Sequence, residues 1–207
     1  IIDNAVLSYV EPYASSACEM VAEVLQYIGD DGIKIKPAEA DAMYAGIVID
    51  TNNFMNQAGV RTFEAAAFLR RNGADVVRVR KLFRDRLEDY RARAEAIQKA
   101  EIYHGAFAIS VCPSEGLESP TVVGAQAANE LLNIIGVKAS FVLTDYRNTI
   151  YISARSIDEI NVQIVMERLG GGGHLNIAGA QLEHYSITEA KDVLKQTLQK
   201  MLDEGDI

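Results

Sequence analysis

The stretch ASFVLTDYRNTIYISAR, residues 139–155, decides the fold of the second half of the chain. Two runs rich in β-branched and aromatic residues, 139–145 and 149–155, lie on either side of the three residues YRN (146–148). Such runs around a short polar connection are typical of a β-hairpin. The run AFAISVC (106–112) is almost entirely apolar and predicts a third, buried strand. We therefore expect a β-sheet in this half of the chain.

Helical patterns alternate with these strands. One begins at Ser119 and closes at Gly136, and a shorter one covers about 162–169. The segment GAQLE (179–183) predicts a further strand, and the capping-box spacing at Ser186 begins the last helix. Because strands, a hairpin and helices alternate, we expect an α/β fold with a mixed sheet flanked by helices.

The first half of the chain is helical by the same criteria. Capping and proline signals begin helices at Ser16, Pro37 and Thr62. From Asp75 to His104 the pattern is helical and heavily charged, as on a solvated connecting helix. The sequence thus divides into a helical segment over 1–84, a connecting helix over 85–104 and a second lobe over 105–207.

The composition is that of a globular protein with 49% hydrophobic residues and a net charge of −9. The acidic total argues against a general nucleic-acid coat protein, and no apolar run approaches the ~20 residues that cross a bilayer. Cys18 and Cys112 have no metal-knuckle spacing, so free thiols are favoured over a disulfide. The segment 70–93 carries nine Lys or Arg against four Asp or Glu. It either steers a polyanionic substrate or forms a solvated helix face.

Four consecutive glycines, Gly170 to Gly173, stand directly before His174. Ordering glycine costs conformational entropy, and its useful property is a backbone that a phosphate can approach without meeting Cβ atoms. His174 can hydrogen-bond a phosphoryl oxygen or assist a leaving group. Gly170 can also end the preceding helix. The alternative is a flexible hinge followed by a surface histidine.

The segment GIVIDTNNF (46–54) places Asp50 where a helix ends. A carboxylate at the negative end of a helix dipole costs about 0.3–1 kcal/mol, and a divalent cation would reverse that cost. The alternative is an Asx-type turn in which Asp50 bonds to the backbone. Arg61 and Arg155 stand near segments of interest. Each either binds phosphate bidentately or forms a structural ion pair.

Taken in order, five motifs of the chain resemble the DHH/DHHA1 phosphoesterase superfamily, in particular the C-terminal catalytic module of membrane-anchored, GdpP-type cyclic-di-AMP phosphodiesterases. They are ASSACEMV (14–21), GIVIDTNNF (46–54), RT (61–62), SARS (153–156) and GGGGHLNIAGAQ (170–181). The resemblance covers nearly the whole chain. It implies a truncated, mostly helical DHH lobe joined by a helical linker to a DHHA1 lobe with a mixed sheet.

The resemblance also implies roles for individual residues. In the family, two Mn²⁺ ions are held by Asp and His residues of four motifs, and Asp50 matches the fourth. The substrate-binding motif matches Gly171, Gly172, Gly173 and His174, and His174 is the implied catalytic residue. Two metal ions bind the phosphoryl group and stabilise the leaving oxygen, while the glycine-histidine motif holds a non-bridging oxygen.

Two shorter matches complete the set of implied positions. Ser153 and Arg155 match the family's Ser-x-Arg-Ser segment, in which the arginine contacts substrate. Ser15 and Ser16 match a segment that borders the active site, with no role assigned to either. The first three metal motifs would precede Ile1, so most metal ligands are expected outside this chain.

We therefore expect part of a metal-dependent hydrolase that converts a cyclic dinucleotide to a linear dinucleotide or mononucleotide, and we expect this chain to be inactive alone. The implied partners are the substrate, the upstream DHH motifs and regulatory domains. The longer protein would be anchored in the cell membrane with this part on the cytoplasmic side.

Two other functions and one association state stay open. A nanoRNase or RecJ-like phosphoesterase would act on short oligonucleotides, and a non-catalytic DHHA1 module would bind nucleotide or nucleic acid without chemistry. Apolar faces and a sheet edge left open in the first lobe would favour a homodimer or aggregation.

Overall fold

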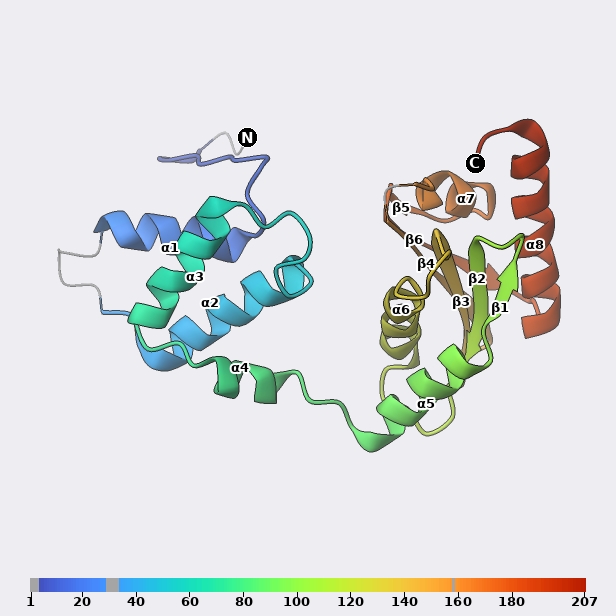
Figure 1. Ribbon diagram of the computed structural model, residues 1–207, viewed down its shortest axis with the longest axis horizontal. Coiled ribbons are helices and arrows are strands. Elements are labelled where there is room, and N and C mark those ends of the chain that lie inside the picture. Colours follow the sequence, from blue (N-terminus) through green and yellow to red (C-terminus); the bar gives the residue numbers. More distant parts are fainter. Residues whose placement is uncertain (1–3, 29–33, 158) are drawn as a thin grey trace. The chain divides into compact units, whose positions relative to one another are not determined.

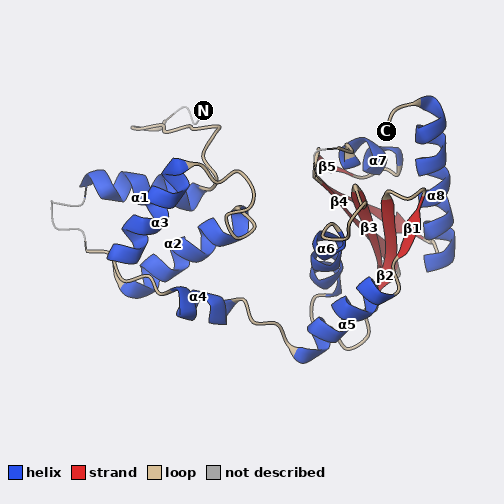
Figure 2. Cartoon of the chain, in the orientation of Figure 1, coloured by secondary structure: helices blue, strands red, loops and turns tan. Residues whose placement is uncertain are grey.

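A computed structural model describes residues 4–28, 34–157 and 159–207, shown in Figure 1. The chain forms two compact units, 1–84 and 85–207. The first unit is helical, and the second combines a β-sheet with helices (Figure 2). This arrangement confirms the α/β class that the sequence predicts.

Among its described residues, 4–28 and 34–84, the first unit contains four helices, which are α1 (Ala17–Ile28), α2 (Pro37–Asp50), α3 (Val60–Arg71) and α4 (Val76–Leu82). Its core consists mostly of small side chains with two larger ones, Ile47 and Leu69, fully buried among them. Small residues let helices approach closely, and Gly46 of α2 is an example. A Cβ atom at Gly46 would lie 2.4 Å from Sγ of Cys18 on α1.

A buried carboxylate joins α1 to α3. Glu19 is 2% exposed and accepts hydrogen bonds from the backbone N–H of Ser15 (3.3 Å), from the Ser15 hydroxyl and from Oγ1 of Thr62 (2.7 Å). The Ser16 hydroxyl accepts from the N–H of Glu19 at 3.1 Å, which is one half of the predicted capping box, while the Glu19 carboxylate accepts from the N–H of Ser15 rather than from that of Ser16. Ser15 and Ser16 therefore have a structural role in holding this helix start.

Helix α3 begins at Val60, whereas the sequence predicted Thr62 as its N-cap. Gly59 is the N-cap of α3, and Thr62 occupies the third helical position. The hydroxyl of Thr62 accepts a hydrogen bond from the N–H of Gly59 at 3.0 Å while it donates to Glu19. Thr62 thus completes the helix start from inside the first turn rather than from the cap position.

Arg61 forms a structural ion-pair network in the first unit. Its guanidinium donates to both carboxylate oxygens of Glu23 (2.7 and 2.6 Å), to Glu11 (3.0 Å) and to the hydroxyl of Tyr9 (2.7 Å). These bonds fasten the segment before α1 to α1 and α3. Of the two alternatives for Arg61, the structure supports the ion pair.

The second unit is built on a six-stranded sheet of order β1-β2-β3-β4-β6-β5. Strands β2 and β3 are parallel, and the other neighbours are antiparallel. The strands are β1 (Glu101–Tyr103), β2 (Phe107–Cys112), β3 (Ala139–Tyr146), β4 (Thr149–Ser156), β5 (Gly172–His174) and β6 (Ile177–Glu183). The helices are α5 (Leu87–Gln98), α6 (Pro120–Leu131), α7 (Val162–Arg168) and α8 (Ile187–Glu204).

The two faces of this sheet are covered to different extents. Large apolar side chains of β2, β3, β4 and β6 pack with α7 and α8 into the main core. On the other face α5 and α6 pack on β2 and β3, and the hydroxyls of Ser110 and Ser140 donate to the carbonyls of Ala96 and Ala128. On this second face of β6, Ile177, Gln181 and Glu183 are exposed and Gly179 is half-buried.

The expected connecting helix over 85–104 differs from the structure. Helix α5 ends at Gln98, and Glu101–Tyr103 form the edge strand β1. The helix is also not solvated on all sides, because Arg93 is 8% exposed. Its guanidinium binds Asp85 (2.6 Å), Glu130 (2.6 Å) and the side-chain oxygen of Gln126 (3.0 Å). These bonds and its apolar contacts make α5 part of the second unit.

The Arg61 network predicts an acid-sensitive first unit. Backbone and Arg61 hydrogen bonds lower the pKa of Glu11, and Arg61 hydrogen bonds lower the pKa of Glu23. A lowered folded-state pKa contributes stability above the unfolded value of about 4.3, and this is lost as the pH falls through the folded pKa. We expect Arg61→Met to lower the melting temperature at pH 7 and to flatten its decline between pH 5 and pH 3, as followed by circular dichroism.

Arg71→Met is the matched control, since Arg71 is exposed on the same helix and makes no ion pair with the described residues. It should keep the acid dependence of the unmodified chain. Equal acid dependence of the two variants would show that Arg61 does not set the titration of these carboxylates.

Candidate nucleotide-binding site

The register of three strands brings most of the predicted site residues onto one face of the sheet. Ser153 of β4 lies opposite Gly179 of β6, which lies opposite Gly172 of β5. Residues directly opposite in neighbouring strands point to the same face. We call this set, Ser153–Gly179–Gly172, the glycine row.

Two further rows flank the glycine row on the same face, because side chains two residues apart along a strand share a face. The histidine row consists of Arg155, Ile177 and His174. On the other side the tyrosine row consists of Tyr151 and Gln181. Successive rows are about 7 Å apart along the strands.

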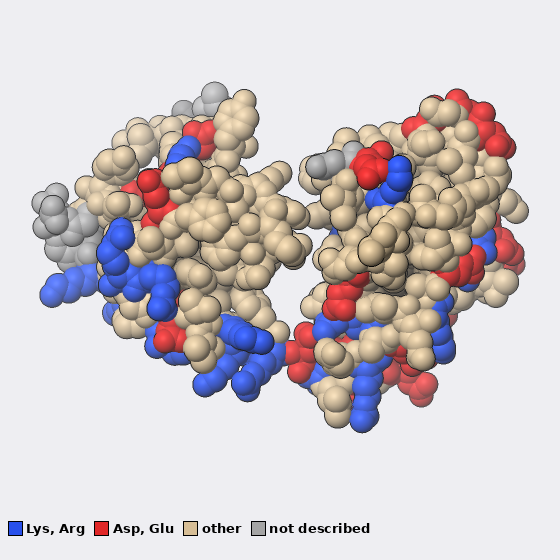
Figure 3. Space-filling view, viewed as in Figure 1, with Lys and Arg blue, Asp and Glu red and all other residues tan. Residues whose placement is uncertain are grey.

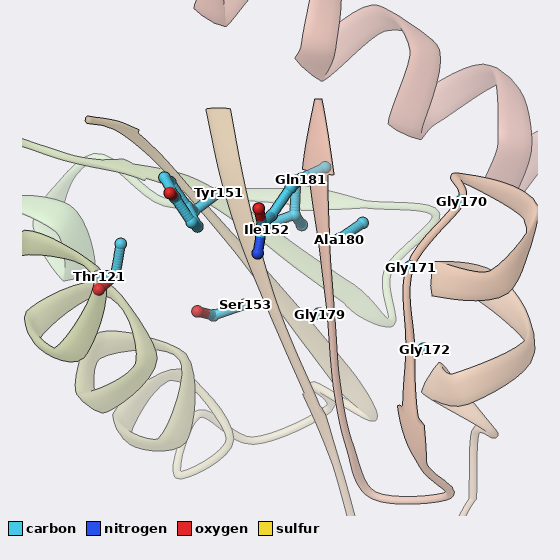
Figure 4. Close-up of a pocket in the computed structure, with 10 residues that line it drawn as sticks. All are labelled: Thr121, Tyr151, Ile152, Ser153, Gly170, Gly171, Gly172, Gly179, Ala180 and Gln181. Atoms are coloured by element: carbon cyan, nitrogen blue, oxygen red, sulfur yellow. The ribbon is translucent and has the colours of Figure 1, made fainter. Parts of the chain in front are cut away.

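An open pocket of about 550 Å³ lies over the tyrosine and glycine rows, beside the start of α6. Figure 4 shows Tyr151 and Ser153 extending from β4 toward the helix that carries Thr121. The lining residues are Thr121, Tyr151, Ile152, Ser153, Gly170, Gly171, Gly172, Gly179, Ala180 and Gln181. Gly173, His174 and Arg155 do not line the pocket, and the last two belong to the adjoining histidine row.

The first two glycines of the GGGG segment end helix α7. Gly170 has a left-handed φ of 78° and its N–H donates to the carbonyl of Glu167 at 3.0 Å. The N–H of Gly171 donates to the carbonyl of Met166 at 2.8 Å, which completes a Schellman motif. These two N–H groups are therefore used within the fold, and an anion nest that includes all four glycines does not form.

Gly171 and Gly173 allow β5 to lie closely against β6. A Cβ atom at Gly171 would lie 2.1 Å from the carbonyl oxygen of Gly179, and one at Gly173 would lie 2.4 Å from that of Ile177. Gly173 also has a φ of 149°. At Gly172, in contrast, a Cβ atom would meet nothing within 4 Å. Gly172 thus leaves space in the pocket, while its two neighbours make close backbone contact possible.

Strand β5 was missed by sequence reasoning, because a glycine-rich segment has low β propensity. The four consecutive glycines show no alternation of residue types, so the sequence offered no signal for this strand. Only the paired backbone distinguishes Gly171 and Gly173, which lie against β6, from Gly172.

The two basic residues of the histidine row differ in their surroundings. Arg155 is half-buried, and its guanidinium donates to Oδ1 of Asn129 (2.9 Å) and to the carbonyl of Ala154 (2.9 Å). Burial lowers its pKa, but arginine starts so high that it remains a cation. His174 is exposed and makes no hydrogen bond or ion pair with the described residues. The imidazole and one edge of the guanidinium are therefore available to a ligand.

Asp50 lies at the end of α2 in the first unit and is exposed. The Asx-turn alternative does not hold, because Thr51 provides the turn bonds. Its hydroxyl donates to the carbonyl of Ile47 (2.6 Å) and accepts from the N–H of Phe54 (2.9 Å). Three left-handed residues follow at 52–54, with φ of 46°, 60° and 63°. The carboxylate of Asp50 makes no hydrogen bond or ion pair within the described part of the chain.

A carboxylate oxygen is a suitable ligand for Mn²⁺. However, within residues 4–28, 34–157 and 159–207 no group of three or more His, Cys, Asp or Glu is placed to hold a metal ion. One carboxylate does not make a two-metal centre. The described residues therefore do not form the implied centre by themselves, and no reaction step is derived through it.

The basic stretch over 70–93 has mainly structural contacts where it is buried. Arg78 of α4 binds Asp41 of α2 at 2.7 Å, and Arg93 is held in the network described above. Figure 3 shows Lys and Arg concentrated on the part of the first unit that carries α4. Cys18 and Cys112 are both free, and burial raises the pKa of the Cys112 thiol to about 11.

The comparisons with known proteins agree with this architecture. Residues 106–201 match the family model of the DHHA1 domain. The second unit of the chain therefore carries a DHHA1 domain.

The particular relatives are bacterial phosphodiesterases. Over 205 residues (99% of this chain) the sequence is 42% identical to the cyclic-di-AMP phosphodiesterase GdpP of Geobacillus thermodenitrificans. Over 194 residues (93% of this chain) it is 43% identical to the cyclic-di-AMP phosphodiesterase PdeA of Listeria monocytogenes. The chain spans only 31% and 29% of the lengths of these two curated relatives.

The fold is also found in a crystal structure of an exopolyphosphatase-related protein from Bacteroides fragilis. The two share 23% sequence identity with a TM-score of 0.83, over 96% of this chain and 60% of the other. Among the described residues, none of the helices has the length and apolar character that a membrane span requires.

The glycine geometry predicts a graded response to added methyl groups. We expect Gly171→Ala and Gly173→Ala each to destabilise the chain by about 1–3 kcal/mol, because the new Cβ would overlap the backbone of β6. Gly172→Ala should stay within about 0.5 kcal/mol of the unmodified chain. Urea denaturation of the three variants measures this directly. Equal losses at all three positions would contradict the assigned path of β5.

Proposed function

We propose that this chain is the nucleotide-binding part of a phosphodiesterase that hydrolyses cyclic dinucleotides, with cyclic-di-AMP as the substrate. The observation that supports this proposal is the open face of the sheet. On this face the glycine row contains Ser153 and Gly172, and the adjoining histidine row contains Arg155 and His174. The identity of 42–43% to two phosphodiesterases of cyclic-di-AMP supports the choice of substrate. The product is a linear dinucleotide or mononucleotide.

Each residue has a role that follows from its position. The guanidinium of Arg155 and the imidazole of His174 bind non-bridging phosphate oxygens, since both carry donors that the fold leaves available. Ser153 adds a hydroxyl in the next row. Gly172 admits the phosphate to the sheet surface, while Gly171 and Gly173 keep β5 close to β6. His174 is also the proposed catalytic residue, because it can stabilise charge on the phosphoryl group as the bond breaks.

We further propose that Asp50 supplies one carboxylate to a centre of two Mn²⁺ ions. This rests on its free, exposed carboxylate and on its match to the family's fourth metal motif. The other ligands are not among the described residues, and upstream DHH motifs would provide them. Such ions, when bound, polarise the phosphoryl group and lower the pKa of bound water. By the same resemblance we propose a membrane-anchored protein with regulatory domains and this part on the cytoplasmic side.

Binding without metal is the first test. We expect the chain to bind cyclic-di-AMP in EDTA by isothermal titration calorimetry. Loss of a hydrogen bond to a charged group costs about 1.5–3 kcal/mol, so His174→Ala should weaken binding roughly ten- to 150-fold. Gly172→Val should also weaken binding, because its side chain would enter the pocket without touching the fold. His184→Ala, at an exposed histidine outside the three rows, is the matched control.

Turnover separates the proposed function from its alternatives. With Mn²⁺ and cyclic-di-AMP, we expect no product from this chain and product from a longer protein that includes the upstream motifs. Turnover by the chain alone would disprove the assignment of the missing ligands. Preference for short linear oligonucleotides would indicate a nanoRNase or RecJ-like enzyme. Nucleotide binding with an inert longer protein would indicate a binding module.

Self-association is a separate proposal about the first unit. An apolar groove of about 330 Å³ lies along α1, and Val21 and Val24 on it are exposed. We propose that this surface pairs two copies of the chain, so the mass measured by light scattering should rise with concentration. Val21→Lys should reduce the association, whereas Val122→Lys, at a similarly exposed valine of α6, should not. A monomer at all concentrations would refute the proposal.

A further inference from the structure

We infer that the tyrosine row is a base-binding subsite in which the amide of Gln181 pairs with the edge of the base and Tyr151 stacks on its face. This inference rests on the proposed function, because it assumes that phosphate occupies the adjoining glycine and histidine rows. It adds two side chains, Tyr151 and Gln181, that the glycine-histidine motif does not contain.

The distribution of charge over the three rows supports this division. The histidine row contains a guanidinium and an imidazole, which suit phosphate. The tyrosine row contains only neutral groups, a phenol ring and a primary amide, which suit a neutral base. The rows are about 7 Å apart, so one nucleotide can place its phosphate and its base in neighbouring rows.

Tyr151 provides a fixed aromatic surface in the pocket. It is half-buried, and its ring lies 6.4 Å from that of Tyr146, at an interplanar angle of 51°. The two rings belong to the ends of β4 and β3, which pair at the hairpin. A ring held by a neighbouring ring stacks on a base with little loss of side-chain freedom, and stacking accepts any base. Tyr151 therefore contributes affinity without selecting between adenine and guanine.

Gln181 provides the group that pairs with the edge of the base. It is exposed, lies directly opposite Tyr151 and extends from β6 toward β4 (Figure 4). Its amide makes no hydrogen bond with the described residues and offers one acceptor and two donors. Adenine presents a donor, its amino group, beside an acceptor nitrogen, and an amide matches this pair bidentately. Guanine presents two acceptors, N7 and O6, on its major-groove edge, but its Watson–Crick edge places the acceptor O6 beside the donor N1–H, so the amide can also pair with guanine there.

Thr121 completes the polar set from the opposite wall. Its side chain lines the pocket from the first turn of α6 and makes no hydrogen bond with the described residues. A hydroxyl both donates and accepts. Thr121 can therefore form a hydrogen bond with either base.

The test is a change of base preference in a single variant, Gln181→Glu. A carboxylate accepts from the two donors of guanine but cannot donate to the acceptor nitrogen of adenine. Titration of the whole chain with cyclic-di-AMP and cyclic-di-GMP in EDTA gives the ratio of the two affinities. Relative to the unmodified chain, we expect the variant to move the ratio of the two affinities toward cyclic-di-GMP by about five- to 150-fold. The ratio is insensitive to the general repulsion between the new charge and phosphate.

Two controls define the readout. Glu183→Gln changes an exposed residue on the same face of β6 outside the pocket and should leave the ratio unchanged. Tyr151→Ala should weaken both ligands at least tenfold, whereas Tyr151→Phe should retain most of the affinity, since stacking needs the ring alone.

The outcomes distinguish this inference from the proposed function. If the chain binds cyclic-di-AMP and His174→Ala weakens that binding, but Gln181→Glu leaves the ratio unchanged, the inference is wrong and the proposed function stands. If the unmodified chain binds neither dinucleotide, both are wrong.

Discussion

The close approach of β5 to β6 is the constraint on which the candidate site depends. Gly171 and Gly173 permit it, because any Cβ atom there would overlap the backbone of β6. The approach fixes the register that sets His174 opposite Ile177 and Gly172 opposite Gly179. A one-residue slip would turn every side chain of β5 to the buried face. The glycines therefore determine how β5 pairs with β6, and this pairing positions the residues of the candidate site.

The polar groups of the chain divide into those that the fold uses and those that it leaves available. Glu19 and Arg61 have several partners each, which explains their positions without any ligand. The side chains of Asp50, His174 and Gln181 make no hydrogen bonds with the described residues and are exposed. A polar side chain without a partner in the protein does not stabilise the fold, even where it is held beside a strained turn or a close strand pair. Because they are exposed, these groups can bind a ligand without breaking any bond of the fold.

The sequence by itself determined the elements and the class of the fold. The capping box at Ser186, the capping bond of the Ser16 hydroxyl and the hairpin over 139–155 appear in the structure as predicted, because each depends on bonds between residues close in sequence. The motifs also predicted the DHHA1 domain that the family model matches over residues 106–201. Local signals failed at β1 and β5, which are three residues each and become strands only by pairing with β2 and β6.

Tertiary structure alone decided how the chosen residues are grouped. Sequence reasoning selected Ser153, Arg155 and the glycine-histidine segment separately, and only the strand register placed them in adjacent rows. It also could not show that Tyr151 and Gln181, thirty residues apart, face the same pocket. The physical reason is that alternation along a strand assigns each side chain to a face, whereas the neighbour across the sheet depends on long-range pairing. The sequence therefore determined what the segments are, and the packing of the sheet decided which of their side chains meet.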